Sequence, residues 1–321
     1  MIKTILASLC ALPLVACVQQ DDSPKNIANA LPTGDQVSIR IPESTAKLAT
    51  SRTGLAVAPA ALGQLSMWYV ATLDVTHVFN GGAEFVLGLV HQVVQNPPTT
   101  IKGNTFTWGP GSDALQPADY KLDVIAVGDG TFTYQLSARS KIVANADFVT
   151  VISGTADPRK GDGQGNGTFS IDFDAAKQAD PTSTGTGSVH AAYDLAKKHL
   201  DLTLDSTDAL GQPLKGDYTY DQAADGGGQM EFQIVGNVAP GPADETISLR
   251  SRWQTTGAGR ADARIAGGDL GALTATASEC WDTHFLQVFY IDALSNGGTL
   301  SASDGQASAC AFTDADLPDA P

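Results

Sequence analysis

Apolar and polar residues alternate in many short segments between residues 120 and 290. Successive side chains of a β-strand point to opposite faces, so this pattern is typical of strands that bury one face. Glycine-rich links separate the segments, and Gly128-Asp129-Gly130 is typical of a tight hairpin turn. The pattern predicts a mainly β protein with one large antiparallel sheet of about eleven strands. The predicted strands centre on Leu122, Tyr134, Thr150, Ile171, Ala191, Leu202, Phe232, Leu249, Ala263, Ala275 and Val288.

Residues 59–96 have a different pattern, in which apolar residues recur close to helical spacing. Pro59 suits the first position of a helix, and Asn80-Gly81-Gly82 suits its end. A second apolar run, from Ala83 to Val94, stops shortly before a pair of prolines. The spacing predicts two apolar helices near residues 59–96, although β-branched residues such as Val75 leave a strand open for the first run.

The run from Ala83 to Val94 is apolar on every side, so a helix there must be buried, and it is too short to cross a bilayer. We therefore expect the large sheet to curve around the two helices as a half-barrel. Small residues on the inner face would leave space for the helices or for a ligand. These small residues are Ala261, Ala263, Ala275 and Ala277.

The first residues have the features of a secretory signal, with Lys3 followed by a short apolar stretch. Leu14-Val15-Ala16-Cys17 closes this stretch and resembles the lipobox of bacterial lipoproteins. The resemblance implies that the chain is cut before Cys17 and that the cysteine sulfur carries a lipid. It also implies that Val18 directs the protein to the outer membrane. A plain secretory signal with a chance cysteine is the alternative.

The sequence divides into a signal peptide (1–16), an acylated cysteine with a polar tether (17–36) and a single β-rich domain (37–321). Alternation at Val37, Ile39 and Ile41 predicts that the domain starts with a strand. Of the 19 basic residues only Lys3 precedes Cys17, so the remaining 18 basic and 35 acidic residues give a net charge of −17. A chain this acidic repels nucleic acid, so we expect a membrane partner through the anchor and no nucleic-acid partner.

Four cysteines are present, and two of them follow the anchor. Cys10 lies in the leader and Cys17 is the acylation site, which leaves Cys280 and Cys310. An even pair in an exported protein predicts a disulfide. The alternative, a metal or reactive-thiol pair, lacks Cys-x-x-Cys spacing and a nearby group of histidines.

Two further resemblances concern the whole domain. Ser278-Glu279-Cys280-Trp281-Asp282, with Cys310-Ala311-Phe312, resembles a C-terminal signature of an uncharacterised group of bacterial outer-membrane lipoproteins. Pro97-Pro98 leading to Trp108-Gly109-Pro110 is similar to that group as well. In architecture alone, an anchored sheet around helices resembles the half-barrel of LolA-type lipoprotein carriers, which implies an apolar ligand but no particular binding residues.

The chain contains no recognisable catalytic, nucleotide or cofactor motif. Asp74 and His77 would share a helix face, but a structural role is favoured over catalysis. Asp162 to Gly167 loosely imitates a calcium loop, yet it lacks the closing glutamate, and a flexible link between strands is the favoured interpretation. We therefore expect no enzyme activity, no cofactor and no metal.

These features predict a membrane-anchored, non-enzymatic carrier of a lipid or another apolar ligand. The alternative is a structural or protein-interaction lipoprotein whose helices fill the sheet and leave no cavity. Aromatic side chains on the predicted helices fit either function, because they could line a cavity or form plain core. These aromatic residues are Trp68, Tyr69, Phe79 and Phe85.

Overall fold

The structure is a computed structural model of the chain. It describes residues 33–43, 61–94, 96–112, 116–158, 164–183, 186–207, 213–236, 239, 241–301 and 303–319. The predicted leader, Cys17 and most of the predicted tether lie outside these residues. Among the described helices, none is long and apolar enough to cross a bilayer.

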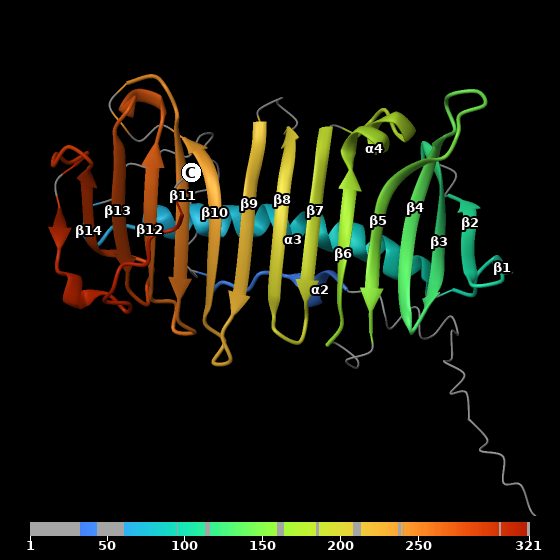
Figure 1. The fold of residues 1–321 in the computed structure, drawn as a ribbon, viewed down its shortest axis with the longest axis horizontal. Helices are drawn as coiled ribbons and strands as arrows, with labels where there is room; N and C mark the ends of the chain where they lie inside the picture. The colour runs from blue at the N-terminus through green and yellow to red at the C-terminus, as the bar shows by residue number, and fades with distance from the viewer. Residues whose placement is uncertain are drawn as a thin grey trace, which may run out of the picture.

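One open antiparallel sheet dominates the fold, and its strands follow one another in chain order (Figure 1). The mainly β class and the single large antiparallel sheet are confirmed. The described strands number 15, so the predicted number of about eleven is too low. The strands are β1 (Thr100–Lys102), β2 (Thr105–Gly111), β3 (Ala118–Gly128), β4 (Thr131–Ser140), β5 (Val149–Asp157), β6 (Asn166–Asp172), β7 (Thr186–Asp194), β8 (His199–Thr207), β9 (Pro213–Gln222), β10 (Gly228–Gly236), β11 (Glu245–Trp253), β12 (Gly259–Ala266), β13 (Thr274–Trp281), β14 (Gln287–Leu294) and β15 (Asp304–Gly305).

Four strands escaped prediction, namely β1, β2, β9 and β15. β1 has three residues and β15 has two, which is too short for an alternating pattern. β2 contains a cis peptide bond between Gly109 and Pro110 and a register shift, so its alternation is interrupted. β9 begins at a proline and has few aliphatic residues. Strand pairing with neighbours, rather than local pattern, makes these segments strands.

One continuous helix, α3 (Met67–Val94), replaces the two predicted helices. It starts at Met67 rather than at Pro59. Ser66 caps the helix, because its hydroxyl oxygen accepts a hydrogen bond from the Tyr69 backbone N–H at 3.1 Å. Asn80-Gly81-Gly82 does not end the helix. Each glycine inside a helix lowers its stability by about 1 kcal/mol relative to alanine. For two glycines this loss is small beside the tertiary packing that stabilises a long buried helix.

The Asn80 side chain also has a role that local sequence does not reveal. Its Oδ1 accepts from the Ile39 backbone N–H at 2.8 Å, and its Nδ2 donates to the Ile39 carbonyl at 2.8 Å. The Tyr69 hydroxyl donates to the Pro42 carbonyl at 3.1 Å, and the Trp253 indole N–H donates to the Arg40 carbonyl at 3.1 Å. Side chains of the domain thus satisfy this backbone, so the strand predicted at Val37–Ile41 is wrong. Helix α2 (Gly34–Val37) occupies its start.

Helix α3 runs across the strands on one face of the sheet (Figure 1). The Thr72 and Ser251 hydroxyls lie 2.6 Å apart, which joins α3 to β11. One turn later, the Thr76 hydroxyl donates to the Met230 sulfur of β10 at 3.9 Å. A helical turn rises about 5.4 Å and strands are spaced about 4.8 Å apart, so successive turns of a helix that crosses a sheet meet successive strands. We call the face under α3 the helix face and the opposite face the open face.

A short third helix, α4 (Phe173–Ala179), follows β6 where the sequence pattern predicts continued strand at Phe173. Asp172 caps it, because its carboxylate accepts from the Ala175 N–H at 2.8 Å. Because the helix starts here, the chain leaves the sheet after Asp172, and the Phe173 side chain packs against the buried hydrophobic core.

Aromatic rings lie over cross-strand glycines on the helix face. A Cβ atom added to any of these glycines would overlap the facing ring, so the absent side chain makes room for the aromatic one. The pairs are Tyr134 with Gly154, Tyr193 with Gly167, Trp253 with Gly228 and Trp281 with Gly259.

We expect Gly154→Ala to destabilise the protein by about 1–3 kcal/mol, because the new methyl group collides with the Tyr134 ring and with the Thr168 carbonyl. Urea unfolding measures the loss. The matched control is Gly111→Ala, where no atom lies within 4 Å of the added carbon. Equal stability of the two variants would show that the Tyr134 ring does not depend on Gly154.

Candidate functional site

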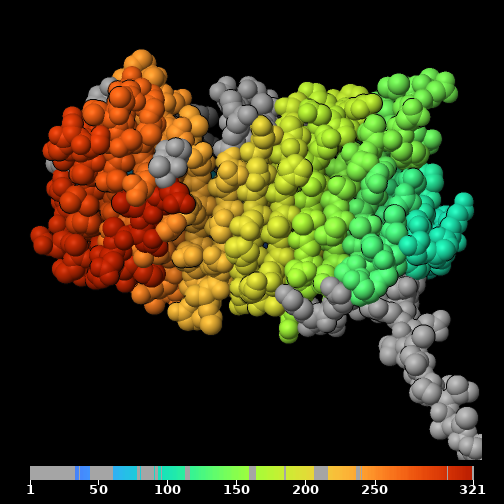
Figure 2. Space-filling model, viewed as in Figure 1, coloured from blue at the N-terminus to red at the C-terminus, as the bar shows by residue number. Residues whose placement is uncertain are grey.

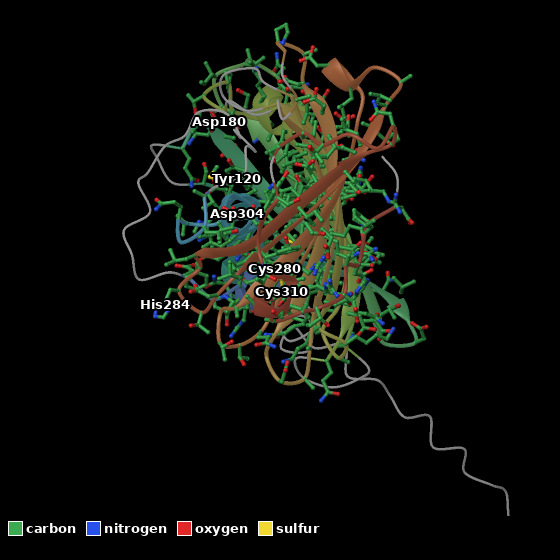
Figure 3. The ribbon with its side chains drawn as sticks, turned by 90° about the vertical axis from the view of Figure 1, so that its left-hand side faces the viewer. Tyr120, Asp180, Cys280, His284, Asp304 and Cys310 are labelled. Carbon is green, nitrogen blue, oxygen red and sulfur yellow. A yellow bond between two sulfur atoms is a disulfide. The ribbon has the colours of Figure 1, made fainter. Side chains whose placement is uncertain are left out.

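The predicted disulfide is confirmed. Cys280 of β13 and Cys310 are bonded, with their Cα atoms 5.4 Å apart (Figure 3). The bond lies on the open face, since Cys280 pairs across the strands with Arg260, whose side chain points to that face. It fixes the C-terminal segment against strands β11 to β13.

Arginine side chains hold this C-terminal segment beyond the disulfide. The Arg260 guanidinium donates to the Phe312 and Thr313 carbonyls at 3.2 and 3.0 Å, and the Arg264 side chain donates to the Pro318 carbonyl at 2.6 Å. In Figure 2 the C-terminal residues, in deep red, lie across the orange strands. This part of the open face is therefore covered by the chain itself.

The Asp262 carboxylate stabilises the neighbouring side chains of Arg252 and Arg260. Arg252 and Arg260 are directly opposed on β11 and β12, where two like charges repel. The fully buried Asp262 carboxylate accepts from Arg252 Nη2 at 2.9 Å and from Arg260 Nε at 2.8 Å. It also accepts from the Ser278 hydroxyl at 2.6 Å. One buried carboxylate thus compensates two guanidinium groups.

Glu279, on the helix face of β13, caps the start of α3. It is fully buried, and its Oε1 accepts from the Met67 backbone N–H at 3.1 Å. A carboxylate is favoured at the positive end of a helix dipole. Burial nevertheless outweighs the hydrogen bonds from Ser66, Met67 and Trp68 and raises the pKa of Glu279 to about 7.

Several buried polar atoms near this cap have no hydrogen-bond partner among the described residues. They are Glu279 Oε2, both side-chain polar atoms of Gln287, and the Trp68 indole nitrogen. Gln287 of β14 is opposite Trp281 of β13, and Glu279 lies two residues before Trp281 on β13. In the sequence, Glu279 is recognisable only as part of a signature. Its burial and its contact with the start of α3 are tertiary features, which no local pattern reveals.

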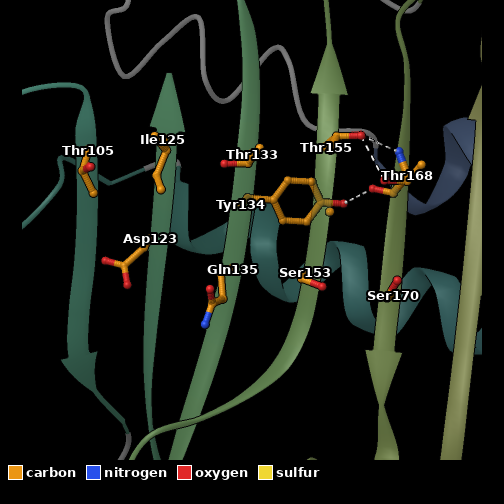
Figure 4. A pocket seen from close by; sticks show the side chains of 11 residues that line it. Thr105, Asp123, Ile125, Thr133, Tyr134, Gln135, Ser153, Thr155, Thr168 and Ser170 are labelled. Carbon is orange, nitrogen blue, oxygen red and sulfur yellow. Dashed lines mark hydrogen bonds between the residues drawn. The ribbon is translucent and has the colours of Figure 1, made fainter. Parts of the chain in front are cut away.

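A hollow of about 530 Å³ lies on the open face across strands β2 to β6 (Figure 4). The lining side chains are small and polar, apart from Ile125 and the Tyr134 ring. The lining residues are Thr105, Asp123, Ile125, Thr133, Tyr134, Gln135, Ser153, Gly154, Thr155, Thr168 and Ser170. No sequence motif marks these residues, because they are the polar half of the strand alternation.

Beyond β7, the open face is acidic. We call Asp201, Asp205, Asp217 and Asp221 of β8 and β9 the acidic stripe. His199 lies between two of them, with Nε2 2.9 Å from Asp201 and Nδ1 2.6 Å from Asp221. Partial burial lowers the pKa of His199, but the hydrogen bonds to Asp221 and Asp201 outweigh this and raise it.

The candidate chemistry from the sequence is not brought together. His77 lies 3.1 Å from Glu43 and both side chains are exposed; among the described residues, no serine forms a hydrogen bond with His77. Of the Asp162–Gly167 segment, the first two residues are outside the described chain, and Asn166 and Gly167 begin β6. Within the described ranges, no three His, Cys, Asp or Glu side chains are arranged to hold a metal.

One serine–histidine contact escaped the sequence analysis. The Ser170 hydroxyl lies 2.8 Å from His190 Nδ1, on the exposed faces of β6 and β7. These residues are directly opposed on antiparallel strands but far apart in sequence, so no local motif reveals them. Their strand β6 is paired on both sides, which engages its backbone N–H groups in the sheet and leaves them unable to form an oxyanion hole.

No known protein family, no curated protein and no solved structure matches this chain.

Glu279→Gln tests the buried cap. A glutamate whose folded pKa is about 7, against an ordinary value of 4.5, costs the folded state about 3 kcal/mol as pH rises through that window. We therefore expect the stability of Glu279→Gln relative to the natural protein to rise by about 3 kcal/mol between pH 4.5 and pH 8. Urea unfolding at several pH values measures this difference.

Asp147→Asn is the matched control, because Asp147 is exposed and the substitution makes the same change from carboxylate to amide. Its stability relative to the natural protein should change little over the same pH range. A relative stability of Glu279→Gln that stays constant with pH would contradict the raised pKa.

Proposed function

We propose that this chain is a lipid-anchored, non-enzymatic binding protein of the outer membrane with a filled core. In this proposal Cys17 carries the lipid, the half-barrel interior holds no ligand, and partners bind to the open face of the sheet. The lipobox resemblance supports the anchor. The observation that carries the proposal is the contrast between the packed helix face and the exposed open face.

The helix face is closely packed along the first half of α3. Trp68, Tyr69, Thr72, Leu73 and Thr76 are each at most 1% exposed. The small residues of β12 and β13 that could leave room for a ligand are buried as well. Their exposed fractions are Ala261 0%, Ala263 0%, Ala275 2% and Ala277 2%. This packing supports the filled core over the lipid carrier.

The contacts around Ser170 and His190 support a binding role over hydrolysis. A serine nucleophile needs a base that is itself oriented, and donors for the developing oxyanion. His190 is exposed on a strand, and the neighbouring backbone donors belong to the sheet. We therefore assign this pair to the polar surface.

Native mass spectrometry tests the filled core. The chain from Val18 onward, purified without detergent and then exposed to membrane extract, should keep the mass of the polypeptide alone. Because a lipid carrier retains its cargo through purification, a stoichiometric co-purified lipid that organic extraction releases would overturn the filled core and favour the carrier.

The anchor is tested by Cys17→Ala. Without a sulfur to acylate, the variant should move from the membrane fraction to the soluble fraction, which cell fractionation followed by immunoblotting measures. Cys10→Ala is the matched control, since the leader cysteine should not affect the distribution. A Cys17→Ala variant that stays in the membrane fraction would contradict lipid attachment at this residue.

A further inference from the structure

We propose that the hollow on the open face of β2 to β6 binds a neutral, polyhydroxylated chain, that is, a glycan without acidic groups. This proposal deepens the proposed function, because it names the class of partner for the surface that the filled core leaves available. It rests on the geometry of the hollow, on the hydrogen-bonding capacity of its lining and on its charge.

The lining residues form two parallel rows across the strands. In the first row, Thr105, Ile125, Thr133, Thr155 and Thr168 are successive cross-strand partners. The register fixes one residue of this row on each of the strands β2 to β6. Neighbouring strands are spaced about 4.8 Å apart, so a linear ligand that lies across the strands meets a new side chain at each step.

The second row lies two residues along each strand. It consists of Asp123, Gln135, Ser153 and Ser170, again as successive partners, and Thr107 of β2 continues it outside the lining. Together the rows present hydroxyl and amide groups on both sides of the hollow. Such groups donate and accept at once, as sugar hydroxyls do, which makes them suited to a ligand that is rich in hydroxyls.

Several of these groups have open hydrogen-bonding capacity. Thr155 and Thr168 are engaged with each other, with their hydroxyls 2.9 Å apart. By contrast, the side-chain hydroxyls of Thr105, Thr133 and Ser153 have no partner among the described protein groups. In Figure 4, Thr133 and Ser153 lie on adjacent strands in the middle of the hollow. A ligand hydroxyl can therefore replace water on these groups without breaking a bond within the protein.

The lining of the hollow carries no uncompensated charge that would attract an ionic ligand. Asp123 is its one acidic lining residue, and its carboxylate already accepts from the Thr107 hydroxyl at 2.6 Å and pairs with Lys121 at 2.9 Å. Lys121 compensates the Asp123 carboxylate, so the lining offers an anion such as phosphate or a uronic acid chain no uncompensated positive charge. A cation finds no unpaired carboxylate in the lining. A neutral ligand is the class that remains.

The hollow also offers an apolar contact and close access. Ile125 is 38% exposed and lies in the first row between Thr105 and Thr133, where it can contact the C–H face of a sugar ring. Apart from Gln135, the side chains of the lining on β4 and β5 that face the hollow are serine and threonine, so a ring can approach the sheet closely. A protein partner would need larger apolar anchors than this lining provides.

Isothermal titration calorimetry with defined hexasaccharides tests the proposal. The full-length protein is kept in a detergent without a sugar headgroup, because a glycoside detergent would compete. The probes are cellohexaose, maltohexaose and the hexamer of N-acetylglucosamine, with a galacturonic acid hexamer as the charged comparison. We expect at least one neutral hexamer to bind and the charged hexamer to bind at least tenfold more weakly.

Thr133→Val with Ser153→Ala removes two open hydroxyls while it keeps the shape of the surface. We expect this double variant to weaken binding of the neutral hexamer about tenfold, as for two neutral hydrogen bonds. Ser153→Trp, which fills the hollow, should abolish binding. The matched control is Thr203→Val with Ser188→Ala, which makes the same two changes on the open face of β8 and β7, outside the hollow.

Three results would overturn the proposal: no binding of any neutral hexamer, binding that the hollow variants leave unchanged, or tighter binding of the galacturonic acid hexamer. Equal unfolding midpoints of the variants and the natural protein show that each variant is folded. Failure of this proposal is separate from failure of the proposed function, because a co-purified lipid is detected without any glycan.

Discussion

A wide open sheet with one apolar face requires a cover, and the rest of this structure depends on how α3 provides it. The helix crosses the strands, so a single element contacts β14 through Trp68, β11 through Thr72 and β10 through Thr76. Its start is secured by the buried Glu279 and its middle by Asn80, which binds the Ile39 backbone. Aromatic rings over glycines complete the packing between neighbouring strands. The covering helix leaves the second face of the sheet to interact with other molecules.

The open face is divided by residue type along the order of the strands. Hydroxyl and amide side chains occupy β2 to β6, the acidic stripe occupies β8 and β9, and arginines of β11 and β12 hold the C-terminal segment. Arg260 would attract anions, but the buried Asp262 and the carbonyls of residues 312 and 313 already accept its hydrogen bonds. The hollow on β2 to β6, where Lys121 pairs with Asp123, is therefore the part of this face with free hydrogen-bonding groups and little electrostatic preference.

Alternation along the strands was sufficient to predict the class of fold and the large antiparallel sheet, because burial of one face leaves a period of two in the sequence. The disulfide between Cys280 and Cys310 followed from the cysteine count once Cys10 was assigned to the leader and Cys17 to the lipid. Features set by tertiary contacts were not accessible in the same way. Asn80-Gly81-Gly82 reads locally as a helix end, and its place inside α3 depends on the sheet below and on Ile39 beside it. The hollow depends on a register of five strands, which no single segment of sequence specifies.

The strictly sequential strand order also determines how such a protein could change in length during evolution. A hairpin inserted between two neighbouring strands would alter no existing connection, as in proteins built from stacked repeats. The crossing helix limits this freedom. Two extra strands widen the sheet by about 9–10 Å, and a helix needs about six further residues to span that width. Insertions in the sheet and in α3 should therefore occur together, and the length of the helix should increase with the number of strands that it crosses.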